Sequence, residues 1–189
     1  MSSQLNTYLS TEEYLTIERK AERKSEYFAG EMFALAGTTK RHNIITGNIV
    51  RVLGNQLLDR PCNVYSMDMR VKVSETGKYT YPDIAVVCGE EKFEDAEMDT
   101  LINPTVLIEV LSDSTEAYDR GKKFEHYQRI ESFAEYILVS QTPYRVEQFI
   151  RESERKWSYS EYRSAEDVAQ LVSVECELLL KDIYVKVEK

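Results

Sequence analysis

The sequence lacks long apolar runs, and this absence argues against a membrane protein. Its unbroken apolar stretches, such as Ile84–Cys88 and Leu178–Leu180, are far shorter than the roughly 18 residues that a membrane-spanning helix needs. The first residues, MSSQLNTYLSTEE, contain no basic segment followed by an apolar one, so we expect no signal peptide. We therefore predict a protein without membrane partners.

Cysteine and histidine are scarce. Cys62, Cys88 and Cys176 are far apart and odd in number, which argues against a disulfide framework and against a four-thiolate zinc site. Such sparse thiols are typical of a reducing compartment, so we predict a cytoplasmic location. With only His42 and His126, a zinc site built from histidines is not expected. Glycine-rich phosphate loops, nucleophile elbows and His-x-x-x-His pairs are also absent.

Positive charge is in short supply. The chain has 24 Lys and Arg against 33 Asp and Glu, a net charge of −9, whereas non-specific affinity for DNA comes mostly from Lys and Arg. Three segments are nevertheless basic: Arg19–Lys24, Lys40-Arg41 and Arg120–Lys123. They are either solvated helix faces or parts of a locally basic surface, and charge alone does not decide between the two.

The length and the hydrophobic patterning predict one α+β domain over residues 1–189. Ser10 and Glu13 form a capping-box pattern that opens a helix to about Lys24. The pattern then predicts strands at 26–28 and 31–35, a helix at 42–58, strands at 63–66, 68–73, 81–88 and 105–111, a helix at 119–130, a strand at 135–140, a hairpin at 144–151 and 156–162, and short elements at 171–174 and up to 187.

Two carboxylates at the ends of buried strands are the informative positions. Asp83 precedes the apolar run IAVVC, and Glu109 interrupts TVLIEVL. A carboxylate in apolar surroundings is costly without a partner, and two of them can converge on a divalent cation such as Mg²⁺. The alternative is structural, with Asp83 on a turn and Glu109 paired to Lys123. Patterning alone leaves both open.

Several short segments around these acids resemble a known family. In chain order they are EYFAGE at 26–31, His42, SMDMR at 66–70, YPD at 81–83, IEVLS at 108–112, YDRGKK at 118–123 and YILV at 136–139. Their order and spacing are similar to those of the "putative restriction endonuclease" family of unknown-function domains, a branch of the PD-(D/E)XK nuclease superfamily. The resemblance covers roughly residues 10–185.

The resemblance implies a fold and a metal site. The fold is an α/β/α restriction-endonuclease-like core, a mixed central sheet flanked by helices with a helix crossing between its third and fourth strands, to which this chain adds β-hairpins. Asp83, Glu109 and the backbone carbonyl of Val110 are the implied ligands of Mg²⁺ or Mn²⁺. The superfamily lysine belongs two residues after the second acid, where this sequence has Leu111.

The resemblance also suggests what replaces that lysine. Lys123, from the following helix, is the implied catalytic ammonium group, although it could simply pair with Asp119 one turn earlier. Lys122 would point about 100° away on a helix and is at most a substrate contact. Glu26 matches a helix-borne acid of the superfamily, and we assign it to the catalytic set.

The remaining candidates are weaker. His42 and Arg41 begin a helix, where a phosphate could bind, although His42 could also cap or pack. Asp68 matches a family position but could merely turn the chain. Tyr127, one turn beyond Lys123, either covers the site or belongs to the core.

Two functions remain. The first is a Mg²⁺- or Mn²⁺-dependent endonuclease that hydrolyses DNA. The second is a binding or interaction module on a nuclease fold, as a homodimer, with weak or lost catalysis; the acidic net charge and Leu111 favour it.

Overall fold

A six-stranded mixed sheet forms the centre of the molecule. The computed structural model describes residues 8–142 and 144–187. The strand order is β11-β10-β9-β8-β6-β3; β8 and β9 run parallel, and the other neighbours are antiparallel. These strands span Cys62–Ser66 (β3), Ile84–Cys88 (β6), Val106–Val110 (β8), Glu135–Val139 (β9), Val146–Ser153 (β10) and Lys156–Tyr162 (β11).

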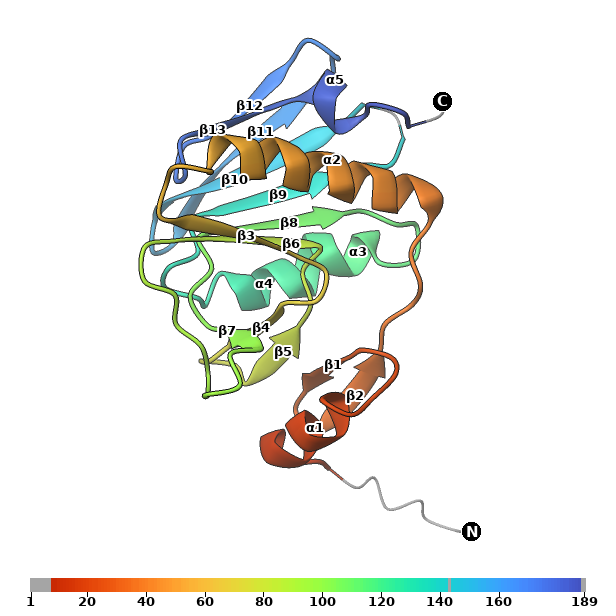
Figure 1. Cartoon of the computed structure of the whole chain (residues 1–189), viewed down its shortest axis with the longest axis vertical. Helices are drawn as coiled ribbons and strands as arrows, with labels where there is room; N and C mark the ends of the chain where they lie inside the picture. The colour runs from red at the N-terminus through yellow and green to blue at the C-terminus, as the bar shows by residue number, and fades with distance from the viewer. Residues whose placement is uncertain (1–7, 143, 188–189) are drawn as a thin grey trace.

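Helices cover both faces of this sheet (Figure 1). The long helix α2, Lys40–Gln56, lies on one face. The crossover from β8 to its parallel neighbour β9 lies on the other face and contains α3 (Glu116–Tyr118), the π-helical turn η1 (Asp119–Lys123) and α4 (Phe124–Tyr127). This is the predicted arrangement, a mixed sheet between helices with one helical crossover.

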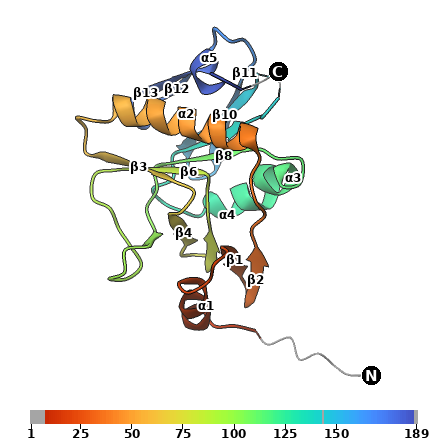
Figure 2. The same cartoon turned by 45° about the vertical axis from the view of Figure 1, so that its right-hand side comes forward.

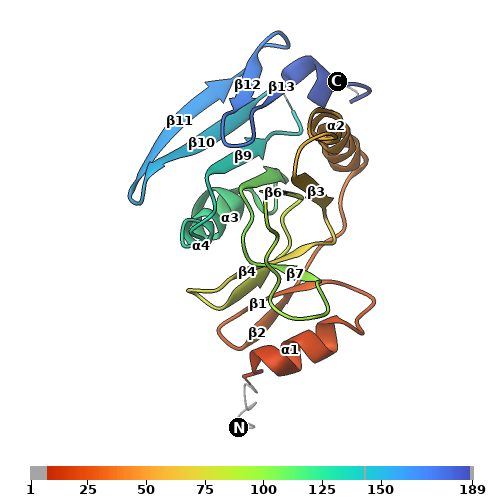
Figure 3. The same cartoon turned by 60° about the vertical axis from the view of Figure 1, so that its left-hand side comes forward.

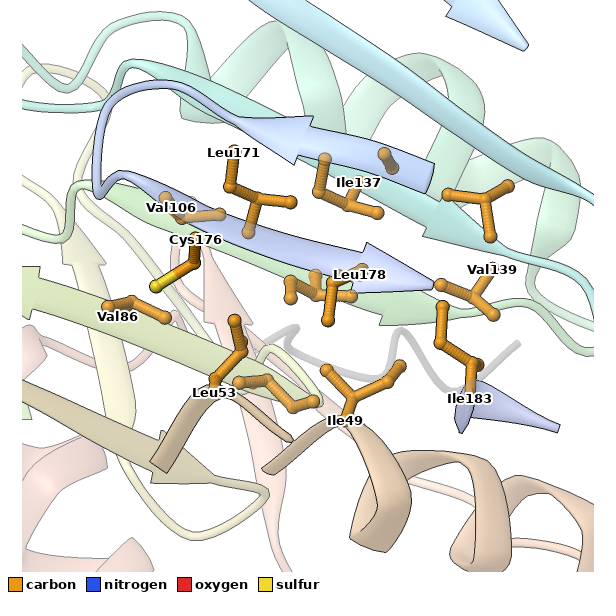
Figure 4. Packing of buried hydrophobic residues seen from close by; sticks show 14 of the residues in the cluster. Ile49, Leu53, Val86, Val106, Ile137, Val139, Leu171, Cys176, Leu178 and Ile183 are labelled. Carbon is orange, nitrogen blue, oxygen red and sulfur yellow. The ribbon is translucent and has the colours of Figure 1, made fainter. Parts of the chain in front are cut away.

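The alternation of side chains along the strands builds two apolar layers. Ile84 and Val86 of β6 pack in the layer under α2, whereas Ala85 and Val87 pack in the layer toward α4. The first layer also receives the C-terminal hairpin of β12 (Val168–Leu171) and β13 (Cys176–Leu179), and α5 (Leu180–Ile183). Figure 4 shows this layer, with Ile49 and Leu53 of α2 and Leu178 of β13 among its side chains. Figure 3 shows the β10–β11 hairpin at the edge of the central sheet, beyond β9.

A second sheet lies beyond α3 and α4, toward the N-terminal end (Figure 2). Its order is β2-β1-β5-β4-β7, with β1 at Ser25–Phe28, β2 at Glu31–Ala34, β4 at Arg70–Val73, β5 at Lys78–Thr80 and β7 at Thr100–Leu101. Helix α1, Thr11–Glu18, packs on it through Tyr14, which stacks on Tyr27. The predicted capping box of Ser10 and Glu13 is present.

Three predicted elements differ from the structure. The first helix ends at Glu18, not near Lys24, and residues 25–28 join the second sheet. The predicted strand 81–88 begins only at Ile84, as β6, because residues 81–83 link β6 to β5 in the other sheet. The predicted helix 119–130 consists of η1 and α4, starts earlier with α3 and ends at Tyr127, and its residues 119–123 adopt π geometry.

The expectation that the cysteines form no disulfide is wrong for one pair. Cys62 and Cys88 lie directly opposite each other on β3 and β6 and form a disulfide bond. Their separation of 26 residues hides this proximity in the sequence, because only the antiparallel pairing brings the two ends together. Cys176 is free and buried. The cysteines therefore no longer support a cytoplasmic location, which stays a prediction. Among the described residues, no helix is long and apolar enough to span a membrane.

Candidate active site

Asp83, directly before β6, lies opposite Glu109 of the adjacent strand β8. The register of β6 and β8 pairs Ile84 with Ile108 and continues to Asp83 and Glu109 one step further. The backbone N–H of Asp83 is 3.4 Å from Glu109 Oε2. Glu109 faces the layer on the α4 side, between the buried side chains of Leu107 and Leu111. The spacing of 26 residues thus brings the two acids to one point of the sheet.

Backbone and histidine contacts fix Asp83. Its Oδ2 atom accepts a 2.7 Å hydrogen bond from the N–H of Val110 and lies 2.9 Å from Nε2 of His42. His42 is in the first turn of α2, where Thr39 caps the helix, and is buried against the sheet. Because the N–H and C=O of one strand residue face the same side of the strand, the Val110 carbonyl also faces Asp83. His42 therefore contacts an acid of the site directly.

Lys123 reaches the same point from the opposite direction. Its Nζ lies 2.9 Å from Glu109 Oε1, 3.5 Å from Asp119 Oδ1 and 3.8 Å from Glu26 Oε1. Tyr127 donates a 2.9 Å hydrogen bond to Glu109 Oε1. The ion pairs with Glu109 and Asp119 that were considered as structural alternatives both exist, and they hold Lys123 inside the site rather than away from it.

The π-helical turn η1 carries two charged residues that are buried together. Its hydrogen bonds are one residue longer than those of an α-helix, and such turns are frequent at functional sites. Asp119 and Lys123 are both buried, and Tyr136 of β9 donates a 3.0 Å hydrogen bond to the Asp119 carbonyl. Lys122, between them in this segment, is exposed and lines the cleft described below.

Glu26 completes the cluster from the second sheet. It lies on strand β1, as the pattern predicted, and so differs from the helix-borne acid of the superfamily to which it was matched. Its carboxylate accepts hydrogen bonds from Lys78 Nζ at 2.8 Å, from the Tyr118 hydroxyl at 2.9 Å and from the Thr80 hydroxyl. Burial by itself raises the pKa of Glu26, but Lys123 and Lys78 outweigh it and bring that pKa to about 2. Glu26 is therefore ionised and anchors both lysines.

The electrostatics of the cluster suit an additional cation. Burial raises the pKa of Glu109 well above its ordinary value, and the neighbouring Asp119 and Asp83 raise it further against the opposing effect of Lys123. Burial also lowers the pKa of Lys123, yet the carboxylates of Glu109, Glu26 and Asp119 outweigh it and raise that pKa. The ammonium group stays charged, and a further cation beside Glu109 would offset the repulsion among the acids.

The available donors fit a hard divalent ion. Asp83 and Glu109 offer carboxylate oxygens and Val110 a carbonyl oxygen, the ligand type that Mg²⁺ takes together with water. No cluster of three or more His, Cys, Asp or Glu side chains in the described part of the chain could hold a metal ion by itself. A site here would therefore combine two side chains with backbone and water oxygens.

The cluster opens into a cleft of about 1200 Å³. Its lining includes Asp83, Glu109, Lys123, Glu26, Val110, His42 and Lys122. Arg41 is half-buried and is not among the described lining residues, so its predicted substrate contact gains no support. Asp68 is exposed and pairs with Lys24 outside the cluster.

Sequence reasoning missed Lys78, Thr80 and Tyr118 as members of the site. Lys78 and Thr80 share one face of β5 by the two-residue alternation, but only the pairing of β5 with β1 turns that face toward Glu26. Tyr118 lies in the segment YDRGKK that carried the family resemblance, and its position there was a usable signal. Asp119 was considered only as an ion-pair partner.

The fold and the site define a nuclease-like α+β protein, and comparison with known proteins agrees. The Uma2 family model, described as "Putative restriction endonuclease", matches residues 11–181. The chain belongs to this family.

Similar proteins come from two organisms. "Uncharacterized protein sll1609" of Synechocystis sp. is 37% identical over 153 residues, covering 81% of this chain and 86% of that protein. "Uncharacterized protein slr1290" of the same organism is 33% identical over 176 residues, covering 93% and 91%. A crystal structure described as a "putative nuclease belonging to DUF820" from Anabaena variabilis superposes with a TM-score of 0.78 at 18% identity, covering 95% of this chain and 99% of that one. At this identity, the structural likeness concerns the fold.

Proposed function

We propose that this protein is a Mg²⁺- or Mn²⁺-dependent endonuclease that hydrolyses DNA phosphodiester bonds in the cleft. The observation that carries the proposal is the convergence of Asp83, Glu109, Lys123 and Glu26 from four separate elements, β1, η1, β8 and the residue before β6. The family and the fold support the nuclease chemistry.

Asp83, Glu109 and the Val110 carbonyl are the residues that would hold the metal ion. A bound Mg²⁺ neutralises charge on the phosphate and makes a water molecule a better nucleophile at neutral pH. The hydrogen bond from Val110 and the contact with His42 keep the Asp83 carboxylate in place for this task.

Lys123 would stabilise the negative charge that develops on the scissile phosphate. Because its pKa is raised, Lys123 keeps its proton and is unsuited to the role of general base. Its buried ammonium group is instead a fixed positive charge, held by Glu26 and Asp119 beside Glu109. Lys123 would supply the positive charge that the superfamily places two residues after the second acid, where this chain has the apolar Leu111.

A second candidate function is a binding or interaction module with weak or lost catalysis. The net charge of −9 and the apolar Leu111 favour it. It differs from the nuclease in a measurable way, since it needs no cleavage and no metal affinity.

The cleavage assay uses plasmid and linear DNA with MgCl₂ or MnCl₂. We expect metal-dependent cleavage that falls about 100-fold or more in Asp83→Asn, which removes the charge of a metal ligand, and in Lys123→Met, which removes a positive charge beside the reacting phosphate. Lys181→Met is the matched control, since Lys181 is exposed on α5 across the sheet, and it should cut like the parent. Thermal unfolding shows that each variant is folded. Absence of cleavage by the parent, or full activity of Asp83→Asn, would contradict the proposal.

A further inference from the structure

The β1–β2 hairpin presents one of its faces to the cleft. In the register of the hairpin, Phe33 lies directly opposite Glu26, and opposite residues of an antiparallel pair share a face. Leu35 continues this face, because its N–H bonds the carbonyl of Lys24 at the end of the hairpin. Phe33, Leu35, Lys24 and Glu26 all line the cleft. An aromatic ring therefore lies one strand away from the catalytic cluster.

The side chains of Phe33 and Leu35 are exposed, although the opposite face of the hairpin is buried. Phe33 is 48% exposed and Leu35 37% exposed. On the other face, Met32 packs against the buried cluster of Tyr14, Tyr27 and Tyr79. An apolar side chain exposed beside polar groups in a cleft is typical of a contact surface.

The hairpin is held rigidly in this position. Its two-residue turn, Ala29-Gly30, has positive φ at both residues, 51° and 87°, as a tight hairpin requires. Phe28, on the cleft face of β1, packs edge-on against His126 of α4 with ring centroids 4.7 Å apart. Because these contacts fix the backbone that carries Phe33, less ordering is needed when its ring binds a flat partner.

The charge of the cleft suits a few phosphates and disfavours a duplex. Arg23 and Lys122 line the cleft, are exposed and form no ion pair within the described residues, whereas Lys78 and Lys123 are neutralised by acids. Duplex DNA carries a charge about every 1.7 Å, and proteins that bind it use broad, strongly positive surfaces. A chain of net charge −9 lacks a comparable excess of cations.

We infer that the cleft accepts single-stranded or locally unpaired DNA, and that Phe33 stacks on a base next to the cleaved phosphate. Stacking on an aromatic side chain is independent of base sequence and supplies affinity where positive charge is limited. Arg23 and Lys122 contact the phosphates on either side. Single-stranded DNA is thus the substrate class of the proposed nuclease. Only the cleavage of the strand rests on the proposed function, because its binding is measured separately.

The test is the affinity for a short fluorescein-labelled oligonucleotide of mixed sequence, measured by fluorescence anisotropy in EDTA so that no metal-dependent cleavage occurs. The single strand should bind at least about tenfold more tightly than the same sequence as a duplex. Phe33→Ala should weaken single-strand binding about tenfold, and Phe33→Trp should keep it. Tyr159→Ala removes an equally exposed aromatic ring on β11, away from the cleft, and should leave the affinity unchanged.

Two results overturn the inference. One is a duplex affinity equal to or higher than that of the single strand; the other is an unchanged affinity in Phe33→Ala. If Phe33→Ala instead converts a dimer to a monomer with the same DNA affinity, the face belongs to a second copy of the chain. These outcomes are independent of cleavage: a protein that binds single strands through Phe33 but cuts nothing keeps this inference and loses the proposed nuclease function.

Discussion

At the scale of single residues, Lys123 shows how structural and functional contacts coincide. The sequence suggested that Lys123 could pair with Glu109 and with Asp119, and both ion pairs occur. Their effect is to bury a lysine that is always charged beside two strand-end acids. The sequence pointed to Asp83, Glu109 and Lys123 but not to Lys78, because no local pattern shows that β5 pairs with β1.

Glu26 gives a prediction for stability against pH. Its pKa is about 2 in the folded protein and 4.5 as a free side chain, so its contribution to stability is complete above about pH 4.5 and is lost as the pH falls toward 2. Glu26→Gln lacks this contribution. The stability difference between the parent and Glu26→Gln should therefore shrink by about 2 kcal/mol between about pH 6 and about pH 3.

Urea unfolding at both pH values measures this difference. Glu97→Gln is the control for a Glu-to-Gln change at an exposed position, on the acidic segment before β7. A difference for Glu26→Gln that stays constant from pH 6 to about 3 would show that Glu26 gains no stability from its lysine partners.

At the scale of elements, patterning predicted most helices and strands but not their geometry. The strands β6, β8 and β9 are long apolar runs buried on both faces, and such runs are readable. The π-helical turn Asp119–Lys123 is not readable, because its geometry depends on tertiary contacts such as the bond from Tyr136 to the Asp119 carbonyl. Residues 81–83 were predicted as part of the strand 81–88, because no local pattern shows that they link β5 and β6 of different sheets.

The glycines of α2 and of the β4–β5 turn give a second prediction, with opposite signs. Gly47 is within α2, and a Cβ added there meets nothing within 4 Å, so Gly47→Ala should raise the free energy of unfolding by about 0.5–1 kcal/mol. Gly77 is equally unobstructed but has φ of +70°, so Gly77→Ala should lower it by about 1 kcal/mol. Urea unfolding of the two variants measures both. A loss of stability in Gly47→Ala would mean that α2 is strained in a way the contacts do not reveal.

At the scale of the whole molecule, the relationships between distant segments are what the sequence could not supply. The disulfide of Cys62 and Cys88 and the placement of Phe33 opposite Glu26 both follow from strand pairing. The net charge of −9 follows from the sequence alone, but only the structure shows where the charged side chains gather. Four acids gather with two lysines in the cluster, whereas Arg23, Lys24 and Lys122 line the rest of the cleft, so the excess of carboxylates is confined to the point where a divalent cation would balance it.

Calorimetric titration of Mn²⁺ tests this central claim most directly, because Mn²⁺ takes the same oxygen ligands as Mg²⁺. We predict sub-millimolar binding at one site, weakened at least about tenfold in Asp83→Asn and in Glu109→Gln, since each removes a ligand charge. Asp68→Asn, at an exposed acid outside the cluster, should bind like the parent. Absence of binding heat, or an unchanged affinity in Glu109→Gln, would contradict a metal site at Asp83 and Glu109 and would favour the binding module.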